Sequence, residues 1–304
     1  MKIIVTGGSG MVGSAIKKIF PNADYPDRRE LQKIFQNPLI LENSIIIHAA
    51  SKVGGVKFNL NNMADFYYEN SQLNQNILHC AYLGKAKKVI SLLSTCIYPD
   101  EKYIKYPLTE EQLHLGPPHE SNYAYAYSKR MIDIMSKAYR KQYGSNFINI
   151  VPNNLYGEND NFDLENSHVI PALMRKIWEA KINNQSSIEV WGDGSPLREF
   201  TYSLDIARIL LFLLENYNEP EPINIGNTEE YSIKEVVQIL CELLEYDGKI
   251  EWNITKPNGQ FRKPSSNKKF LELGWNQADY TPLKEGLKKT CEWFKINYPN
   301  VRGV

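Results

Sequence analysis

An excess of charge of either sign, a long hydrophobic run and closely paired cysteines are all missing from this sequence. Lys plus Arg and Asp plus Glu both number 35 in the 304 residues, so no overall field draws the chain to nucleic acid or to an anionic membrane. The longest purely aliphatic and aromatic run, 209–214, is far too short to span a bilayer, and no apolar leader precedes the first strand. We therefore expect a cytoplasmic protein that acts on a small molecule, with no nucleic acid and no membrane as partner.

The cysteines are few and scattered. Cys80, Cys96, Cys241 and Cys291 show no Cys-x-x-Cys spacing, which argues against both a zinc knuckle and a disulfide framework. This usage is typical of a reducing compartment. We predict no metal site.

A glycine-rich turn follows the first apolar run of the chain. Residues 3–5 are apolar, Gly7, Gly10 and Gly13 follow at intervals of three, and helical spacing begins at Met11. In such a turn Gly7 permits the tight bend, Gly10 lets the backbone approach a pyrophosphate, and Gly13 allows close packing of the helix. A glycine triplet alone is weak evidence, but its place between a strand and a helix predicts a nucleotide-binding turn.

Apolar runs and helical stretches alternate along the first half of the chain. The apolar runs are 44–48, 89–93 and 147–151, and the helical stretches lie near 63–83 and 122–143. This alternation predicts an α/β protein with a Rossmann-type, doubly wound parallel sheet.

The pattern becomes irregular after Pro152. A helix is expected from about 168 to 180, a glycine-rich turn at 192–196, a further helix at 203–216 and a strand at 222–226. We expect residues 1–157 plus about 200–227 to form an NAD(P)-binding domain. Residues from about 158–199 plus 228–304 would then form a smaller C-terminal α/β domain that binds the substrate.

Tyr125 and Lys129 are four residues apart, which places a phenol and an ammonium on one face of the expected helix. The positive charge would lower the pKa of the phenol from ~10 toward working pH and make Tyr125 a usable acid or base. Ser94 follows an apolar strand at the edge of the sheet where sites form, so its hydroxyl could bind a substrate oxygen. The plainer interpretations are a packed tyrosine, a solvated lysine and a serine that caps the strand end.

Ordered segments along most of the chain resemble the motifs of one enzyme family. They are 5–15, 49–55, 94–99, 125–129, 154–157, 160–162, 167–171 and 198–200. On these residues the chain resembles the extended short-chain dehydrogenase/reductases, most closely the GDP-L-fucose synthase family. So many motifs in the same order rarely agree by accident.

The resemblance implies NADPH-dependent reduction of the C4 ketone of a GDP-linked 4-keto-6-deoxy sugar, a hexose or a heptose. Ser94, Tyr125 and Lys129 would be the reductase triad, with Lys129 also holding the nicotinamide ribose. Cys96 and His168 stand where the family has the base and the acid that epimerise C3 and C5. A C4 ketone acidifies the hydrogens on both carbons, so a thiolate and an imidazolium could exchange them before reduction. Whether this chain still epimerises stays open.

The same resemblance implies the cofactor contacts. They are Gly7, Gly10, Met11, Val12, Gly13, Arg28, Ala49, Ala50 and Lys129. Asp24, near the end of an expected second strand, could accept a ribose 2′-hydroxyl and favour NADH, whereas Arg28 and Arg29 on an exposed loop could pair with a 2′-phosphate. The family habit favours NADPH over NADH.

For the substrate, the resemblance implies contacts from Asn154, His168, Trp191, Arg198 and Lys263. Arg198 would clasp the nucleotide diphosphate, and Lys263 would be a second cation there. Trp191 would wall the guanine or the sugar, although aromatic core packing is an equal alternative. Relatives dimerise through helices equivalent to 63–83 and 122–143, so we expect a homodimer.

Four alternative functions are compatible with this fold. A 4,6-dehydratase would carry an Asp-Glu pair after the Ser/Thr at this strand end, but Thr95 is followed by Cys96 and Ile97. A nucleotide-sugar 4-epimerase with bound NAD shares the triad and is the enzymatic alternative, together with a reductase that does not epimerise. A non-catalytic dinucleotide-binding regulator would need only the glycine turn.

Overall fold

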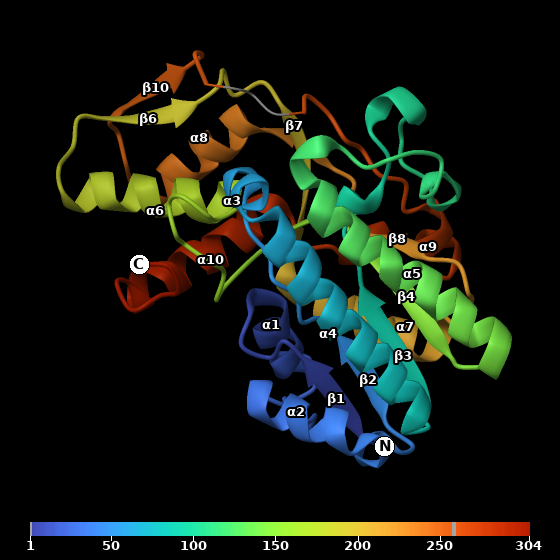
Figure 1. The fold of residues 1–304 in the computed structure, drawn as a ribbon. Coiled ribbons are helices and arrows are strands. Elements are labelled where there is room, and N and C mark those ends of the chain that lie inside the picture. Colours follow the sequence, from blue (N-terminus) through green and yellow to red (C-terminus); the bar gives the residue numbers. More distant parts are fainter. Residues whose placement is uncertain (1, 257–259) are drawn as a thin grey trace.

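Five parallel strands form the central sheet of the computed structural model, which describes residues 2–256 and 260–304 (Figure 1). The strands are β1 (Ile3–Thr6), β2 (Ile45–His48), β3 (Lys88–Leu92), β4 (Phe147–Pro152) and β8 (Ile223–Ile225), in the order β1-β2-β3-β4-β8. The residues of β2, β3 and β4 are all buried, as expected for parallel strands covered on both faces. The predicted Rossmann-type sheet is confirmed.

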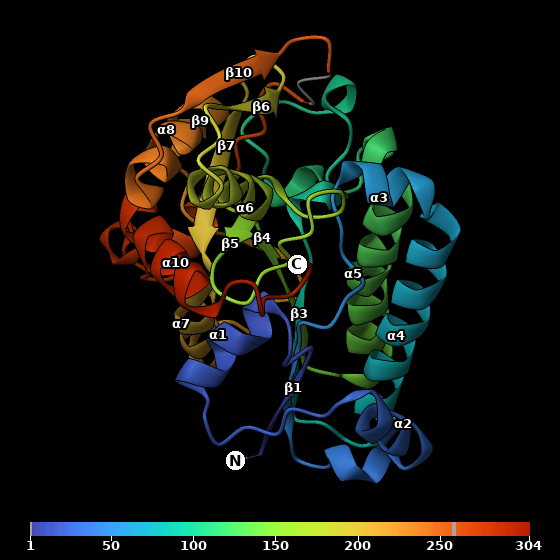
Figure 2. The same ribbon diagram turned by 90° about the vertical axis from the view of Figure 1, so that its left-hand side faces the viewer.

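Helices cover both faces of this sheet (Figure 2). Helices α1 (Met11–Ile19) and α7 (Ser203–Asn216) pack together on one face, and α4 (Met63–Leu83) and α5 (Tyr123–Tyr143) pack together on the other. Helix α5 ends at Gly144, whose φ of 70° is the left-handed conformation that favours glycine at a helix end. None of the helices in the described ranges is long and apolar enough to cross a membrane.

The segment between β1 and β2 differs from the sequence-based expectation. Asp24 forms a single bridge to β1 instead of ending a regular strand. Arg28 lies at the start of helix α2 (Arg28–Gln36) and not on a loop, because Asp27 and Glu30 form a capping box in which each side chain accepts from the other's backbone N–H at 2.8 Å. Because β2 pairs with β1 on the side opposite Asp24, the order of strands reverses at β1. Ligands bind at such a switch point in open α/β sheets.

A second lobe lies above the carboxyl ends of the sheet strands, at the top left of Figure 1. Its helices are α6 (Val169–Ile182), α8 (Ile233–Leu244) and α10 (Leu283–Asn297). Its strands are β5 (Asn154–Tyr156), β7 (Leu197–Tyr202) and β9 (Glu230–Ser232) in one small sheet, and β6 (Ser187–Trp191) with β10 (Lys249–Asn253) in another. The short helices α3 (Val56–Asn61) and α9 (Lys268–Glu272) complete the set.

The buried side chains form a core for each lobe and do not follow the expected domain limits at every point. Phe200 and Tyr202 of β7 pack in the core of the second lobe, although we placed residues from about 200 with the sheet. Phe270 and Tyr280 pack against the sheet core with α1 and α7, although they fall within 228–304. The division into two domains of those bounds stays a prediction.

Candidate active site

The glycine turn leads from β1 into α1 and lies against the end of β2. Gly7 has a φ of +82°, and a Cβ there would lie 2.8 Å from the Ala50 Cα; at Gly13 it would lie 2.1 Å from the Gly7 carbonyl oxygen. Gly10 differs, because its Cβ would meet only that oxygen at an ordinary 3.6 Å. The fold therefore requires glycine at Gly7 and Gly13 but leaves open space at Gly10. The predicted cofactor contacts Met11 and Val12 follow in the first turn of α1, which carries no acidic residue.

A buried network of polar side chains lies next to this turn and joins the ends of β1 and β2 to α4. Ala50 N donates to Thr6 Oγ1 at 3.2 Å, Thr6 Oγ1 lies 2.8 Å from His48 Nδ1, and His48 Nε2 lies 2.9 Å from Asn74 Oδ1. Asn74 Nδ2 donates to the Ser128 carbonyl at 2.9 Å. Burial and the charge of Lys129 lower the pKa of His48 to about 4, so the imidazole is neutral at physiological pH. No local pattern predicted this network, whose one signal in the sequence is a histidine at the end of an apolar strand.

Tyr125 and Lys129 lie on α5 as predicted, but the predicted effect on the phenol is wrong. Lys129 is buried, its Nζ donates to the Leu92 carbonyl at 2.9 Å, and the Nζ lies 6.0 Å from the centre of the Tyr125 ring. Burial and the charge of a Cys96 thiolate raise the pKa of Tyr125, and a hydrogen bond with the Ser51 side chain only partly opposes them. Burial also lowers the pKa of Lys129 to about 8. Tyr125 therefore keeps its proton and is suited to act as an acid.

Ser94 and Cys96 lie where β3 ends. The Ser94 hydroxyl accepts from Cys96 N at 3.3 Å and caps the short 3₁₀ turn Thr95–Ile97, so the capping interpretation of Ser94 applies and its predicted catalytic role stays a prediction. Arg130 of α5 donates to the Ile97 carbonyl at 2.5 Å. The turn that carries the thiol is thus held to the helix that carries Tyr125.

One predicted substrate cation, Lys263, interacts with Cys96, and the other, Arg198, interacts with Lys263. Burial lowers the pKa of Lys263, the charge of a Cys96 thiolate opposes this, and the charge of Arg198 adds to it. Cys96 therefore interacts with both Tyr125 and Lys263. Residues from 94 to 263 in the chain are brought to one region between the two lobes.

His168 lies on the second lobe, exposed, as the N-cap residue of α6. The segment before it is joined to the loop after β2, because Gly55 N donates to the Asn166 carbonyl at 2.8 Å and a Cβ at Gly55 would lie 2.7 Å from the Ser167 carbonyl oxygen. Burial raises the pKa of Asp160, and the charge of His168 opposes that rise. The structure thus connects the segments that carry His168 and Ala49–Ala50, while the role of His168 stays a prediction.

The other predicted substrate residues have varied surroundings. Arg198 is half-buried, and its Nη1 donates to the Leu197 carbonyl at 2.7 Å and to the Phe261 carbonyl at 3.3 Å. Trp191 is 53% exposed, with Lys256 Nζ 5.4 Å from its ring centre, so core packing does not explain it. Asn154 is exposed and donates to the Glu199 carbonyl at 2.8 Å.

Glu199, which the sequence analysis did not single out, is a buried carboxylate next to Arg198. It is 2% exposed and accepts hydrogen bonds from Ser265 N at 2.8 Å, Ser265 Oγ at 2.5 Å and Asn153 Nδ2 at 3.2 Å. Burial raises its pKa to about 7, against the lowering effect of these hydrogen bonds, and the charge of Glu230 adds to the rise. The only sequence signal is an acidic residue next to Arg198 in the segment 198–200.

This pKa predicts a pH-dependent stability. The pKa of Glu199 is about 7 in the folded protein and 4.5 ordinarily. The stabilisation from its protonated form is therefore fully present below pH 4.5 and is lost as the pH rises through 7. Relative to Glu199→Gln, we expect the wild-type free energy of unfolding to fall by on the order of 3 kcal/mol over that window. Urea unfolding of both proteins at pH 5 and pH 8 measures it, and a constant difference between them would contradict it.

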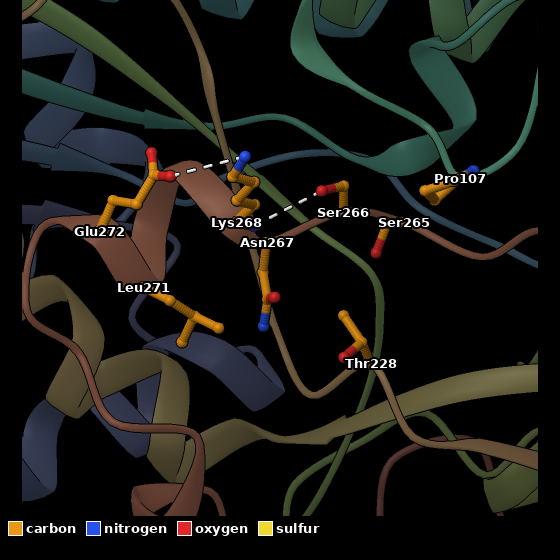
Figure 3. Close-up of a pocket in the computed structure, with 8 residues that line it drawn as sticks. All are labelled: Pro107, Thr228, Ser265, Ser266, Asn267, Lys268, Leu271 and Glu272. Carbon is orange, nitrogen blue, oxygen red and sulfur yellow. Dashed lines mark hydrogen bonds and ion pairs between the residues drawn. The ribbon is translucent and has the colours of Figure 1, made fainter.

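A cavity of about 510 Å³ lies beside Ser265, the hydrogen-bond partner of Glu199 (Figure 3). It is lined by Pro107, Thr228, Ser265, Ser266, Asn267, Lys268, Leu271 and Glu272. None of the predicted catalytic side chains is among these residues. Within the described ranges, no group of three or more His, Cys, Asp or Glu side chains is arranged to hold a metal ion.

Comparison with known proteins agrees with this arrangement. The sequence profile described as the NAD dependent epimerase/dehydratase family matches residues 17–226, more than half of the chain. The chain belongs to this family. Within it, the GDP-L-fucose synthase of Dictyostelium discoideum is 37% identical over 317 residues, which cover 99% of this chain and 97% of the relative. The predicted family resemblance is confirmed.

Solved structures of the family are also similar. A GDP-L-fucose synthetase from Naegleria fowleri, crystallised bound to NADP, has a TM-score of 0.89 at 39% identity and covers 99% of this chain and 94% of that one. A GDP-6-OMe-4-keto-L-xylo-heptose reductase from C. jejuni has a TM-score of 0.87 at 29% identity and covers 97% and 98%. These likenesses confirm the Rossmann-type fold and an oxidoreductase of the GDP-fucose synthase type.

Proposed function

We propose that this protein reduces the C4 ketone of a GDP-linked 4-keto-6-deoxy sugar with NADPH. The observation that carries the proposal is the meeting of a protonated phenol, Tyr125, with Cys96 and with the cations Lys263 and Arg198 in one region between the lobes. Reduction of a ketone needs an acid, and a nucleotide diphosphate needs cations. Relatives named for GDP-L-fucose synthesis and for reduction of a GDP-linked keto-heptose support the substrate class.

The catalytic roles follow from the surroundings of each side chain. NADPH supplies a hydride when bound. Tyr125 keeps its phenol proton because it is buried. It donates this proton to the C4 oxygen, which becomes an alkoxide as the hydride arrives. Lys129 is fixed by the Leu92 carbonyl beside Tyr125 and is placed to hold the nicotinamide ribose. The Ser94 hydroxyl binds the same substrate oxygen.

The glycine turn fits the cofactor. A pyrophosphate fits at the N-terminus of α1, because the space beside Gly10 is open. The first turn of the helix carries no acidic side chain that would repel the phosphates. Ala49 and Ala50 lie against the glycine turn, and Arg28, at the start of α2, is our proposed partner for a 2′-phosphate.

We expect Gly10→Ala to weaken NADPH binding by about 10- to 100-fold without destabilising the fold, because the added methyl fills ligand space only. Gly13→Ala should instead destabilise the protein, because its Cβ would overlap the Gly7 carbonyl. NADPH fluorescence titration and thermal unfolding of both variants distinguish the two effects. Equal loss of stability in both would contradict this assignment.

A finer proposal concerns C3 and C5. Cys96 as a thiolate, with Lys263 near it, removes a proton next to the ketone, and His168 returns one from the opposite side. Epimerisation would then precede reduction.

The experiment that tests these proposals is NADPH oxidation at 340 nm with GDP-4-keto-6-deoxy-mannose in D₂O, followed by NMR of the product. Oxidation with deuterium at C3 and C5 supports both steps, and oxidation without it leaves a plain C4 reductase. No oxidation with this sugar would favour a keto-heptose, which is tested next. Cofactor binding with no turnover of either sugar would favour a regulator, and turnover with retained NAD would favour a 4-epimerase.

The protein acts as a homodimer through the outer surface of α4 and α5. Tyr67, Tyr68 and Ile134 on these helices are 48%, 64% and 60% exposed, respectively, and apolar surface of this kind is typical of an interface. We expect wild type to sediment as a dimer and Ile134→Glu as the 35.0 kDa monomer. Leu211→Glu on α7, where Leu211 is 49% exposed, is the matched control and should stay dimeric. A monomeric wild type at micromolar concentration would contradict the proposal.

A further inference from the structure

The segment 260–267 carries Lys263 and runs beside β7, which carries Arg198. Leu197 N donates to the Phe261 carbonyl at 2.9 Å, and Arg198 Nη1 donates to the same carbonyl. Two residues beyond Lys263, Ser265 binds Glu199 through both its N–H and its hydroxyl. The lysine is therefore held between two anchors, and both anchors are on the stretch of β7 that includes the arginine.

The other edge of the segment is also occupied. Leu108 N donates to the Pro264 carbonyl at 2.8 Å, and Ser266 N donates to the Leu108 carbonyl at 2.9 Å. These are backbone contacts with a loop. The contact of Ser265 with Glu199 is different, because it joins the segment to a buried carboxylate in the second lobe. A hydrogen bond to a charged group is stronger than one between neutral groups.

The hydrogen bonds of Glu199 matter for the nearby charges. In the described part of the chain its carboxylate accepts from Ser265 and Asn153, and no ion pair joins it to Arg198 or Lys263. The charged and titratable groups that interact with it are Glu230, Arg262 and Tyr280, and Arg262 is itself paired with Glu230. Glu199 therefore fixes the segment without neutralising either cation of the proposed diphosphate site.

We infer that Glu199 is a positioning residue for diphosphate binding, which acts through Ser265 to hold Lys263 beside Arg198. The inference rests on the proposed function, because it takes a nucleoside diphosphate as the group bound by the two cations. Without the Ser265 contact, the segment after Lys263 keeps its backbone bonds with Leu108 but loses its link to β7. The Lys263 ammonium then samples positions away from Arg198. The second phosphate of the nucleotide then loses a cation, whereas the rest of the nucleotide does not.

Ser265 and its neighbour Ser266 provide a matched pair of variants. In Figure 3 the Ser265 hydroxyl points away from the Ser266 hydroxyl, which lies toward Lys268. Both are serines of the same segment, but only Ser265 binds Glu199. We expect Ser265→Ala to lower the ratio of GDP affinity to GMP affinity by about tenfold, and Ser266→Ala to leave it unchanged. Isothermal titration with GDP and with GMP measures the ratio.

A second pair of variants changes the carboxylate itself. Glu199→Gln keeps an acceptor for Ser265 N and gains an amide NH₂ that can donate to the Ser265 hydroxyl, so it should retain most of the GDP preference. Glu199→Ala removes both contacts and should lose at least as much of the preference as Ser265→Ala, which removes only the hydroxyl contact. NADPH affinity should be the same in all variants, since the glycine turn lies on the other lobe.

The outcomes separate the inference from the function on which it rests. A wild-type protein that does not bind GDP would overturn the proposed function. A wild type that prefers GDP over GMP, with Ser265→Ala and Glu199→Ala keeping the whole preference, would overturn the inference alone. Equal weakening of GDP and GMP would also overturn it, because general loss of structure does not select the second phosphate.

Discussion

Replacing Tyr125 with phenylalanine lowers kcat for reduction by a factor of about 10²–10⁴, the range expected for loss of a positioned general acid. The phenol is held in its protonated form because burial and the nearby Cys96 charge raise its pKa. Phenylalanine keeps the ring and removes only the proton donor. We therefore expect unchanged NADPH affinity and a similar KM for the keto sugar, measured by single-turnover oxidation of NADPH.

The control for this variant is Tyr127→Phe. Tyr127 lies on the same helix, half-buried, with its ring centre 5.4 Å from the Arg130 guanidinium carbon, and we assign it no part in the chemistry. Its hydroxyl should be dispensable. Activity of Tyr125→Phe within tenfold of the wild type would show that another group delivers the proton.

Replacing Cys96 with alanine reduces deuterium incorporation at C3 and C5 by a factor of about 10²–10⁴. The thiol is the predicted base, and the Lys263 amine interacts with it. Alanine removes the base but leaves the 3₁₀ turn, since the hydrogen bond to Ser94 comes from the backbone N–H of residue 96. The measurement is NMR of the sugar after incubation in D₂O with NADP⁺, which allows exchange without reduction.

Cys241→Ala is the matched control for the thiol. Cys241 is half-buried in the second lobe, where burial raises its pKa, and its removal should leave exchange at the wild-type rate. If Cys96→Ala exchanged as fast as wild type, the thiol would be a packing residue and the protein a plain reductase.

Local patterns along the chain predicted the main elements of the first lobe well. The helices expected at 63–83 and 203–216 have those limits in the structure, and each packs against a neighbouring helix, α5 or α1. The parallel strands were predicted from short apolar runs, because a strand covered on both faces has apolar residues along its whole length. The small β5-β7-β9 sheet was not predicted, since its pairing joins residues 154–156, 197–202 and 230–232, which no local pattern connects.

Two of the errors in the site arise from tertiary contacts, and the third arises from a local signal that was overlooked. The pKa of Tyr125 was expected to fall because sequence spacing gives the distance to Lys129 but not the burial of the phenol, which dominates. Glu199 was missed because its partners, Asn153 and Ser265, lie far from it in sequence. Arg28 was placed on a loop although the Asp27 to Glu30 spacing is a capping-box signal that was open to recognition.

Residues 270–280 return to the first lobe and pack against the core of its sheet. Phe270 stacks on Trp275, with ring centres 5.4 Å apart, and together with Tyr280 these rings cover the apolar surface of α7. The family profile ends at residue 226, so a fragment cut to that profile would leave this surface bare to water. We therefore expect residues 1–226 alone to aggregate, because residues 227–304 supply the aromatic side chains that cover α7.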